Sequence, residues 1–290
     1  MKVIAIIVLY NPERGKVIKK LKSVAYQVDK LCLIDNSSDS NIYLIDEFPE
    51  AIYYPQFHNL GIAAAQNVGL KYAMKHQYDF VLFSDPDSAV PDQAVKNLMD
   101  TYQRLTISGY HVGAVGSTAY SESTNLPYHI KDCFIRKINN QRVTEVSYTM
   151  NSISIIPLEL FHRVGLMDES LFIDGVDDEW CWRATSQLGC RFFLDDNVII
   201  KHNLGKSGGK IGNKTISIAS PQRLYYEYRN YLWLRRRDYV PRHWINYNGW
   251  KYFVKLFCYP LFVSPRVSNL TNIIRGIKDG LVKGNDSAKF

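Results

Sequence analysis

Apolar and polar positions follow one another in blocks along the first 120 residues. Five short apolar runs are predicted to be strands, and longer segments with helical periodicity separate them. The predicted strands are 3–9, 31–35, 51–57, 79–84 and 111–117, and the predicted helices are 14–28, 61–76 and 91–107. Uninterrupted apolar strands are typical of parallel strands covered on both faces. The pattern therefore predicts an α/β domain with a mostly parallel central sheet.

Polar side chains follow four of these strands at the point where each strand ends. Asn11 follows the first strand, and "DNSSD", "HNLG" and "SDPD" follow the next three. Ligands of such sheets gather beyond the carboxyl ends of the strands. We therefore expect these residues to lie at one edge of the sheet and to form a binding site.

The second part of the chain predicts further mixed elements. Residues 152–156 read as a strand, "PLELFHRVG" as a short helix, "GVDDEWCWRATSQLGC" as a helix ending at Gly189, and "RFFLDDNVIIKH" as a strand. A Gly- and Lys-rich loop at 204–214 is expected to close over a ligand, and from Pro221 the chain is aromatic and basic.

These elements divide the chain into a catalytic domain and an extension. The catalytic domain is expected at 1–215, with a ligand-binding half at 1–117 and a catalytic half at 118–215. Residues 216–290 are expected to form a helical, basic and aromatic C-terminal region.

Composition excludes several classes of protein. The five cysteines contain no CxxC pair, which argues against a disulfide framework or a zinc knuckle and favours a reducing cytosol. The N-terminal apolar run lacks the features of a signal peptide, and no stretch reaches the roughly 18 apolar residues that span a membrane. No GxGxxG follows the first strand and no GxxxxGK[ST] occurs, so a dinucleotide site and a P-loop are poorly supported.

Charge is distributed unevenly along the chain. The formal net charge is +7, but residues 201–290 hold 17 basic and 4 acidic side chains, whereas the first 200 hold 18 and 24. This asymmetry predicts an acidic catalytic body and a basic C-terminal region with an anionic partner. The partner could be a nucleic acid, a phospholipid surface or a phosphorylated substrate.

Three groups of residues are candidates for chemistry. Asp85 and Asp87 could hold Mg²⁺ or Mn²⁺, or could lie in a solvated turn. Asp177, Asp178 and Glu179 cluster at the start of a helix, where a carboxylate could supply a general base or could cap a helix N-terminus, which favours acidic residues. His202, at the end of a strand, could complete a metal site or be a structural histidine.

Each of these motifs is weak evidence alone, but their order along the chain is informative. "VLYNP", "LIDNSSD", "NLGIAAAQNVGL", "LFSDPDS", "MDESLFIDGVDDEWCWRA" and "IIKH" follow one another over about 200 residues. In this order the chain resembles the family 2 glycosyltransferases with the GT-A, Rossmann-like nucleotide-sugar-binding fold. More narrowly, it resembles bacterial rhamnosyltransferases that build O-antigens and related surface polysaccharides of the lipopolysaccharide type. Pro86 stands where these rhamnosyltransferases often have Gln.

The resemblance implies a role for each candidate residue. The nucleotide base would lie near Tyr10, Asn11, Asp35 and Asn36, and the sugar diphosphate near Asn59, Gly61 and Asn67, with Asp85 beside the donor. The metal ligands would be Asp85, Asp87 and His202. Asp177 aligns with the catalytic base, and Asp178 is the second catalytic candidate.

The resemblance also implies the reaction and its setting. It implies an inverting, metal-dependent transfer of L-rhamnose from dTDP-L-rhamnose, with Mn²⁺ or Mg²⁺, to a lipid-linked oligosaccharide. The enzyme would be cytoplasmic and peripheral on the inner face of the membrane, and could be oligomeric. UDP-sugar donors, a nucleotidyltransferase, an inactive nucleotide-sugar-binding relative and a basic nucleic-acid-binding protein remain alternatives, although no nucleic-acid partner is expected.

Overall fold

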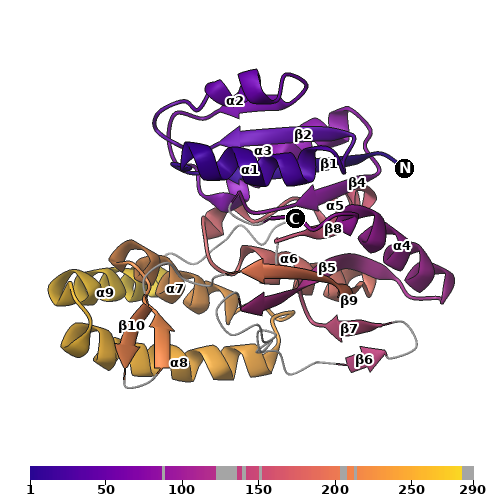
Figure 1. Cartoon of the computed structure of the whole chain (residues 1–290). Coiled ribbons are helices and arrows are strands. Elements are labelled where there is room, and N and C mark those ends of the chain that lie inside the picture. The colour runs from indigo at the N-terminus through magenta and orange to yellow at the C-terminus, as the bar shows by residue number, and fades with distance from the viewer. Residues whose placement is uncertain are drawn as a thin grey trace. The chain divides into compact units, whose positions relative to one another are not determined.

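Two compact units make up the part of the chain that the structure describes. The structure is a computed structural model and describes residues 1–86, 89–121, 136–138, 142–149, 152–202, 208–211 and 214–282. The first unit consists of Met1–Phe172 and Val176–His202. The second consists of Ile173–Gly175 and residues from Asn203 onward (Figure 1).

The first half of unit one follows the predicted alternation of strands and helices. Its strands are β1 (Val3–Leu9), β2 (Lys30–Asp35), β3 (Ile52–Pro55), β4 (Phe80–Phe83) and β5 (Val112–Ser121). Its helices are α1 (Arg14–Ala25), α2 (Tyr43–Glu47), α3 (Ile62–Lys75) and α4 (Ala94–Ile107). The five strands and three long helices confirm the prediction. The short α2 was not predicted, because five residues are too few to display a helical period.

The second half of unit one holds the remaining strands and helices of the catalytic region. Its strands are β6 (Arg136–Ile138), β7 (Val143–Val146), β8 (Ser154–Pro157) and β9 (Arg191–His202). Its helices are α5 (Leu158–Val164), a 3₁₀ turn (Glu169–Leu171) and α6 (Val176–Leu188). Gly165 and Gly189 follow α5 and α6 with φ of 93° and 67°, so both predicted helix stops are confirmed.

A single nine-stranded sheet organises unit one. Its strand order is β3-β2-β1-β4-β8-β5-β9-β7-β6. Strands β3, β2, β1 and β4 are mutually parallel, and β5 pairs in parallel with β9. Only β8 and β7 run against the other described strands, because each pairs antiparallel with both of its neighbours. The sheet is mostly parallel, as predicted, and its carboxyl edge is shared by the first four strands.

Helices cover both faces of this sheet. On one face, α1 and α4 pack on alternate strand residues such as Ala5 and Leu82 in the main hydrophobic core. On the other face, α3 lies so close to β1 that a Cβ on Gly69 would meet Ile6 at 2.6 Å. There the ring of Phe161 in α5 also packs against Phe83 of β4, at 6.3 Å between centroids. Burial on both faces explains why these strands read as continuous apolar runs.

Unit two is a helical body with a small hairpin. It contains β10 (Gly208–Ile211), β11 (Lys214–Ser217), α7 (Pro221–Leu234), α8 (Arg242–Phe262) and α9 (Arg266–Val282) (Figure 1). The sequence predicted a plain loop at 204–214, but β10 and β11 form an antiparallel pair there. Residues 204–207 and 212–213 of that segment lie outside the described part. No helix among the described residues is long and apolar enough to cross a membrane.

Small residues let α9 approach α7 closely. A Cβ on Gly276 would meet the carbonyl oxygen of Tyr225 at 2.5 Å, and one on Gly280 would meet the Leu232 side chain at 2.8 Å. Around this contact, Leu224, Tyr228 and Ile273 form the core of the unit together with tyrosines of α8. The predicted helical C-terminal region is therefore confirmed, and it has a hydrophobic core of its own.

Candidate active site

The ends of β1 and β2 are joined by hydrogen bonds. Leu9 and Asp35 are direct neighbours in the parallel register, so the residues that follow them come together. The backbone N–H of Asn36 donates to the Leu9 carbonyl at 2.8 Å, and the backbone N–H of Asn11 donates to Ser37 Oγ at 2.8 Å. Beside them, the Tyr10 side chain is exposed. The predicted cluster of residues 10–11 and 35–36 is therefore brought together at one edge.

Asp35 is buried at this edge and accepts hydrogen bonds on both carboxylate oxygens. The donors are the Tyr53 hydroxyl at 2.5 Å, the Asn41 backbone N–H at 2.8 Å, the Asn41 side chain at 3.0 Å and the Ser37 N–H at 3.2 Å. Burial by itself would raise the pKa of Asp35, but hydrogen bonds from Tyr53 and Asn41 outweigh it and hold the pKa below its ordinary value. These hydrogen bonds favour the carboxylate form of Asp35 and tie it to Ser37 and Asn41.

Asn36 ties the end of β2 to the turn before α3. Its side-chain amide donates to Asn59 Oδ1 at 2.9 Å, and its Oδ1 accepts from the Leu60 N–H at 2.8 Å. Asn59 Oδ1 in turn accepts from the Gly61 N–H at 2.9 Å. Most of the residues expected to bind the base and the diphosphate thus lie along one rim, which consists of residues 10–11, 35–37 and 59–61 and is tied together by hydrogen bonds; Asn67 and Asp85 lie outside it.

Gly61 starts α3 in a conformation that favours glycine. Its φ is 83°, and an added Cβ would meet the Phe172 carbonyl oxygen at 2.6 Å and its ring at 2.5 Å. The next residue, Ile62, donates its N–H to that same carbonyl at 2.7 Å. The N-terminus of α3 and the segment before α6 are therefore packed backbone against backbone at this point.

We expect Gly61→Ala to destabilise the protein and weaken donor binding. The alanine would need a strained φ, about 1 kcal/mol or more, and the backbone of Phe172 would have to move. Chemical unfolding and donor titration would measure both effects. Gly15→Ala is the matched control, because its Cβ would meet nothing within 4 Å. Equal stability of the two variants would contradict the close packing described.

Asn67 lies on α3 and is almost completely buried. Its side-chain amide donates to the Met167 carbonyl and to Glu169 Oε1, both at 2.9 Å, and its Oδ1 accepts from the Met167 N–H at 3.0 Å. These bonds use both donors of the amide. Asn67 therefore ties α3 to residues 167–169, and its contact with a diphosphate stays a prediction.

The predicted metal ligands are only partly within the described chain. Asp85 follows the carboxyl end of β4 and is half-buried. Its backbone carbonyl accepts a hydrogen bond from Ser84 Oγ at 3.4 Å. His202 is the last residue of β9, which runs in the same direction as β4, and the structure describes its backbone only. Asp87 lies outside the described residues.

The residue types expected at this site suit a divalent cation. A carboxylate oxygen and an imidazole nitrogen are ligands that Mn²⁺ or Mg²⁺ accept. Among the described side chains, which include neither Asp87 nor the His202 ring, no group of three His, Cys, Asp or Glu residues could hold a metal ion. The three-residue site therefore stays a prediction.

The acidic cluster at the start of α6 divides into two kinds of carboxylate. Asp177 and Asp178 are half-buried in the first helical turn. Glu179 is fully buried and bonds Arg183 at 2.9 and 3.1 Å. Burial, together with the negative charges of Asp177 and Asp178, raises the pKa of the Cys181 thiol. Because Glu179 is buried and paired with Arg183, Asp177 and Asp178 are the carboxylates of this cluster that remain candidates for proton transfer.

Sequence reasoning missed Arg183. The residue is 1% exposed, and its guanidinium donates to the Val164 carbonyl at 2.7 Å and to the Leu166 carbonyl at 2.8 Å, besides pairing with Glu179. This residue fastens α6 to the turn after α5. The available signal was the i, i+4 spacing of Glu and Arg in "EWCWR", which is usually a surface pattern.

Residues 173–175, which directly precede α6 in the sequence, are held by α7. Arg223 pairs with the Asp174 carboxylate, with Nη2 2.5 Å from Oδ1. The Asn230 amide donates to the carbonyls of Ile173 at 2.6 Å and Asp174 at 2.9 Å. The motif "YYEYRNYLWLRRR" therefore has a structural function that its composition did not reveal.

Comparison with solved structures identifies the fold. Staphylococcus aureus TarS 1-349 in complex with UDP-GlcNAc matches with a TM-score of 0.61 and 17% identity, covering 97% of this chain and 81% of that one. GalNAc-T7 with UDP, GalNAc and Mn²⁺ matches with a TM-score of 0.54 and 13% identity, covering 91% and 57%. At these identities the likeness concerns the fold alone, which is the predicted GT-A fold with a helical C-terminal part.

Comparison with protein sequences identifies the family. The dTDP-rhamnosyl transferase RfbF of Shigella flexneri is 30% identical over 246 residues, which cover 82% of this chain and 81% of that protein. The profile of "Glycosyl transferase family 2" matches residues 4–165, more than half of the chain. The chain belongs to glycosyl transferase family 2.

Proposed function

We propose that this glycosyltransferase moves L-rhamnose from dTDP-L-rhamnose to a hydroxyl group of a growing surface glycan. The observation that carries the proposal is the hydrogen-bonded rim at the carboxyl edge, formed by residues 10–11, 35–37 and 59–61 in a family 2 chain. Crevices at such strand ends are where α/β sheets bind nucleotides. The choice of rhamnose is supported by the likeness to a dTDP-rhamnosyl transferase.

The proposed chemistry is a single displacement with inversion. Asp177 accepts the proton of the acceptor hydroxyl as that oxygen attacks the anomeric carbon, and Asp178 is the alternative base. Asp85, Asp87 and His202 would hold Mn²⁺ or Mg²⁺. A divalent cation bound there would offset the charge of the diphosphate leaving group.

We assign the proposed roles to successive regions of the chain. Donor binding is assigned to 1–117, catalysis and the acceptor to 118–215, and an acceptor or membrane interface to 216–290. A lipid-linked acceptor at the inner face of the membrane is supported by the basic balance of residues 201–290, 17 basic against 4 acidic side chains. The enzyme would then be a peripheral protein of the cytoplasmic face.

A UDP-sugar donor is the second candidate. It is favoured by the match to TarS, which was crystallised in complex with UDP-GlcNAc, and by the match to GalNAc-T7 with UDP. The fold is compatible with either nucleotide, so the nature of the base has to be measured.

A donor panel tests the proposal. The chain is incubated with dTDP-L-rhamnose, UDP-glucose and UDP-GlcNAc, with Mn²⁺, Mg²⁺ or EDTA, and nucleoside diphosphate release is measured. We expect turnover of dTDP-L-rhamnose with a divalent cation, and loss of activity in EDTA that added metal restores. Turnover of a UDP-sugar without turnover of dTDP-L-rhamnose would show that the donor is a UDP-sugar. Full activity in EDTA would show that the transfer needs no divalent cation.

A further inference from the structure

Helix α8 carries two different sets of aromatic residues. The rings of Tyr252 and Tyr259 are buried in the core of unit two. On the opposite side, Trp250 is 69% exposed, Phe253 54% and Phe257 52%. The sequence showed only that aromatic and basic residues interleave here, and the structure divides them into a packed face and an exposed face.

The exposed residues form a continuous stripe along the helix. We call Trp250, Phe253, Phe257 and Leu261 the outer stripe, because their spacing of three and four residues places them on one helical face. The Trp250 and Phe253 rings are 5.8 Å apart between centroids, and the Phe253 and Phe257 rings 5.2 Å. A contiguous exposed apolar patch of this kind marks an interaction surface.

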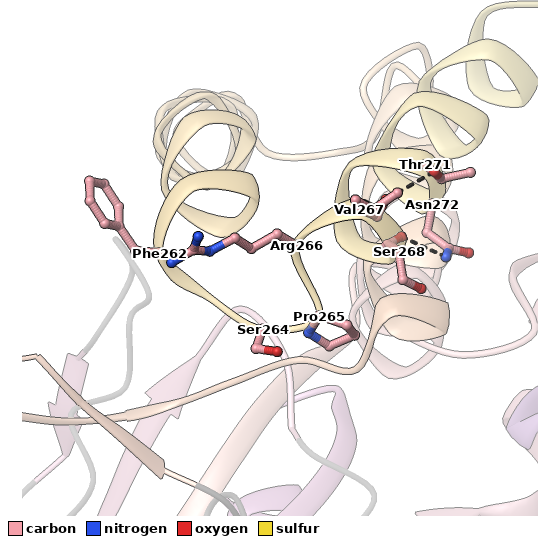
Figure 2. A pocket seen from close by; sticks show the side chains of 8 residues that line it. All are labelled: Phe262, Ser264, Pro265, Arg266, Val267, Ser268, Thr271 and Asn272. Atoms are coloured by element: carbon pink, nitrogen blue, oxygen red, sulfur yellow. Dashed lines mark hydrogen bonds between the residues drawn. The ribbon is translucent and has the colours of Figure 1, made fainter.

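The outer stripe ends beside a hollow at the corner between α8 and α9. The hollow has a volume of about 860 Å³. Its lining combines apolar Phe262 and Val267, which are 73% and 80% exposed, with Arg266 at the start of α9. Figure 2 shows the Arg266 side chain extending from α9 toward the end of α8 that carries Phe262. The remaining lining residues are Pro265 and the polar residues Ser264, Ser268, Thr271 and Asn272.

Charge decides which partner suits this surface. Residues 221–282 contain 11 basic and 3 acidic side chains. Two copies of this region would repel each other if they met face to face, whereas an anionic lipid surface attracts it. Among the described residues, no carboxylate forms an ion pair with Arg266.

We propose that the outer stripe and the α8–α9 corner dock on an anionic phospholipid surface. The stripe lies in the membrane plane with its rings at the boundary between headgroups and acyl chains, and Arg266 meets lipid phosphate at the corner. The proposal deepens the lipid-linked acceptor of the proposed function by assigning the membrane contact to named residues. It requires no spanning helix, in agreement with the described helices.

Vesicle flotation without donor or metal tests this proposal. Full-length chain is mixed with vesicles of phosphatidylcholine alone or of phosphatidylcholine with phosphatidylglycerol. We expect binding to the anionic vesicles, reduced at least about tenfold by the combined Trp250→Ser, Phe253→Ser and Phe257→Ser substitutions. Arg266→Gln should reduce it about fivefold. Ile107→Ser, on the exposed end of α4, is the control and should bind like the original chain.

Two outcomes would overturn the proposal. Unchanged vesicle binding by the triple variant would remove the stripe from the membrane contact. A dimer in light scattering that the triple variant converts to monomer, with no vesicle binding by either, would assign the stripe to a second copy. Circular dichroism checks that the variants fold, and single Trp250→Ser and Phe253→Ser chains replace the triple variant if it does not. Because the donor panel is a separate measurement, failure of vesicle binding and failure of sugar transfer can be told apart.

Discussion

Asp177→Asn is expected to lower kcat about 10²–10⁴-fold, the range that a positioned general base contributes. Asn has nearly the same shape but cannot accept a proton from the acceptor hydroxyl. Asp177 is half-buried in the first turn of α6, so the substitution should leave the fold intact. Initial rates of nucleoside diphosphate release measure the loss, and calorimetric titration should find donor affinity within about twofold of the original.

Asp178→Asn is the matched comparison. It removes the neighbouring carboxylate from the same helical turn, about 100° around the helix axis. We expect it to lose much less activity than Asp177→Asn. A larger loss in Asp178→Asn would move the base to that residue, and full activity in both variants would remove the role from this turn altogether.

Arg183→Met is expected to lower the free energy of unfolding by about 3–5 kcal/mol, the usual cost of breaking a buried ion pair. Methionine leaves the fully buried Glu179 carboxylate without its cation, and the carbonyls of Val164 and Leu166 without their donors. Denaturant titration measures the change. Replacing Glu179 and Arg183 together by methionine should recover part of the loss, since no unpaired charge then remains buried.

A surface pair with the same spacing provides the control for this prediction. Arg163 and Glu159 on α5 also have an i, i+4 spacing. Their side chains are largely exposed, and Arg163 Nη1 is 3.9 Å from Glu159 Oε1. Arg163→Met should therefore change stability by about 0–1 kcal/mol. Similar losses in Arg163→Met and Arg183→Met would contradict the importance assigned to burial of the Glu179–Arg183 pair.

Local pattern was sufficient for much of unit one. The uninterrupted apolar runs at 3–9 and 79–84 became β1 and β4, because both faces of these strands are covered by helices. The glycines after "FHRV" and "SQL" ended α5 and α6, because each adopts a positive φ. Polar residues after β1 and β2 meet at one edge, because parallel strands bring their carboxyl ends together.

Side-chain partners at a distance in the sequence could not be inferred in this way. The partners of the Asn67 amide, Met167 and Glu169, lie about a hundred residues further along the chain, and no local pattern indicates them. Arg183 looked like a surface residue by its spacing to Glu179. Burial of both partners, together with two backbone carbonyls that accept from Arg183, makes it structural.

By itself, the sequence determined the succession of the five strands and three long helices in the first 120 residues, the polar edge and the basic character of the C-terminal region, since these depend on residue type and local periodicity. Only the tertiary structure decided which aromatic residues of α8 are buried and which form the outer stripe. It alone also decided that Asp35 is buried and accepts hydrogen bonds from Tyr53 and Asn41, and that α7 holds residues 173–175. The physical reason is that burial and hydrogen-bond partners are set by segments far apart in the chain, and one segment's pattern cannot specify them.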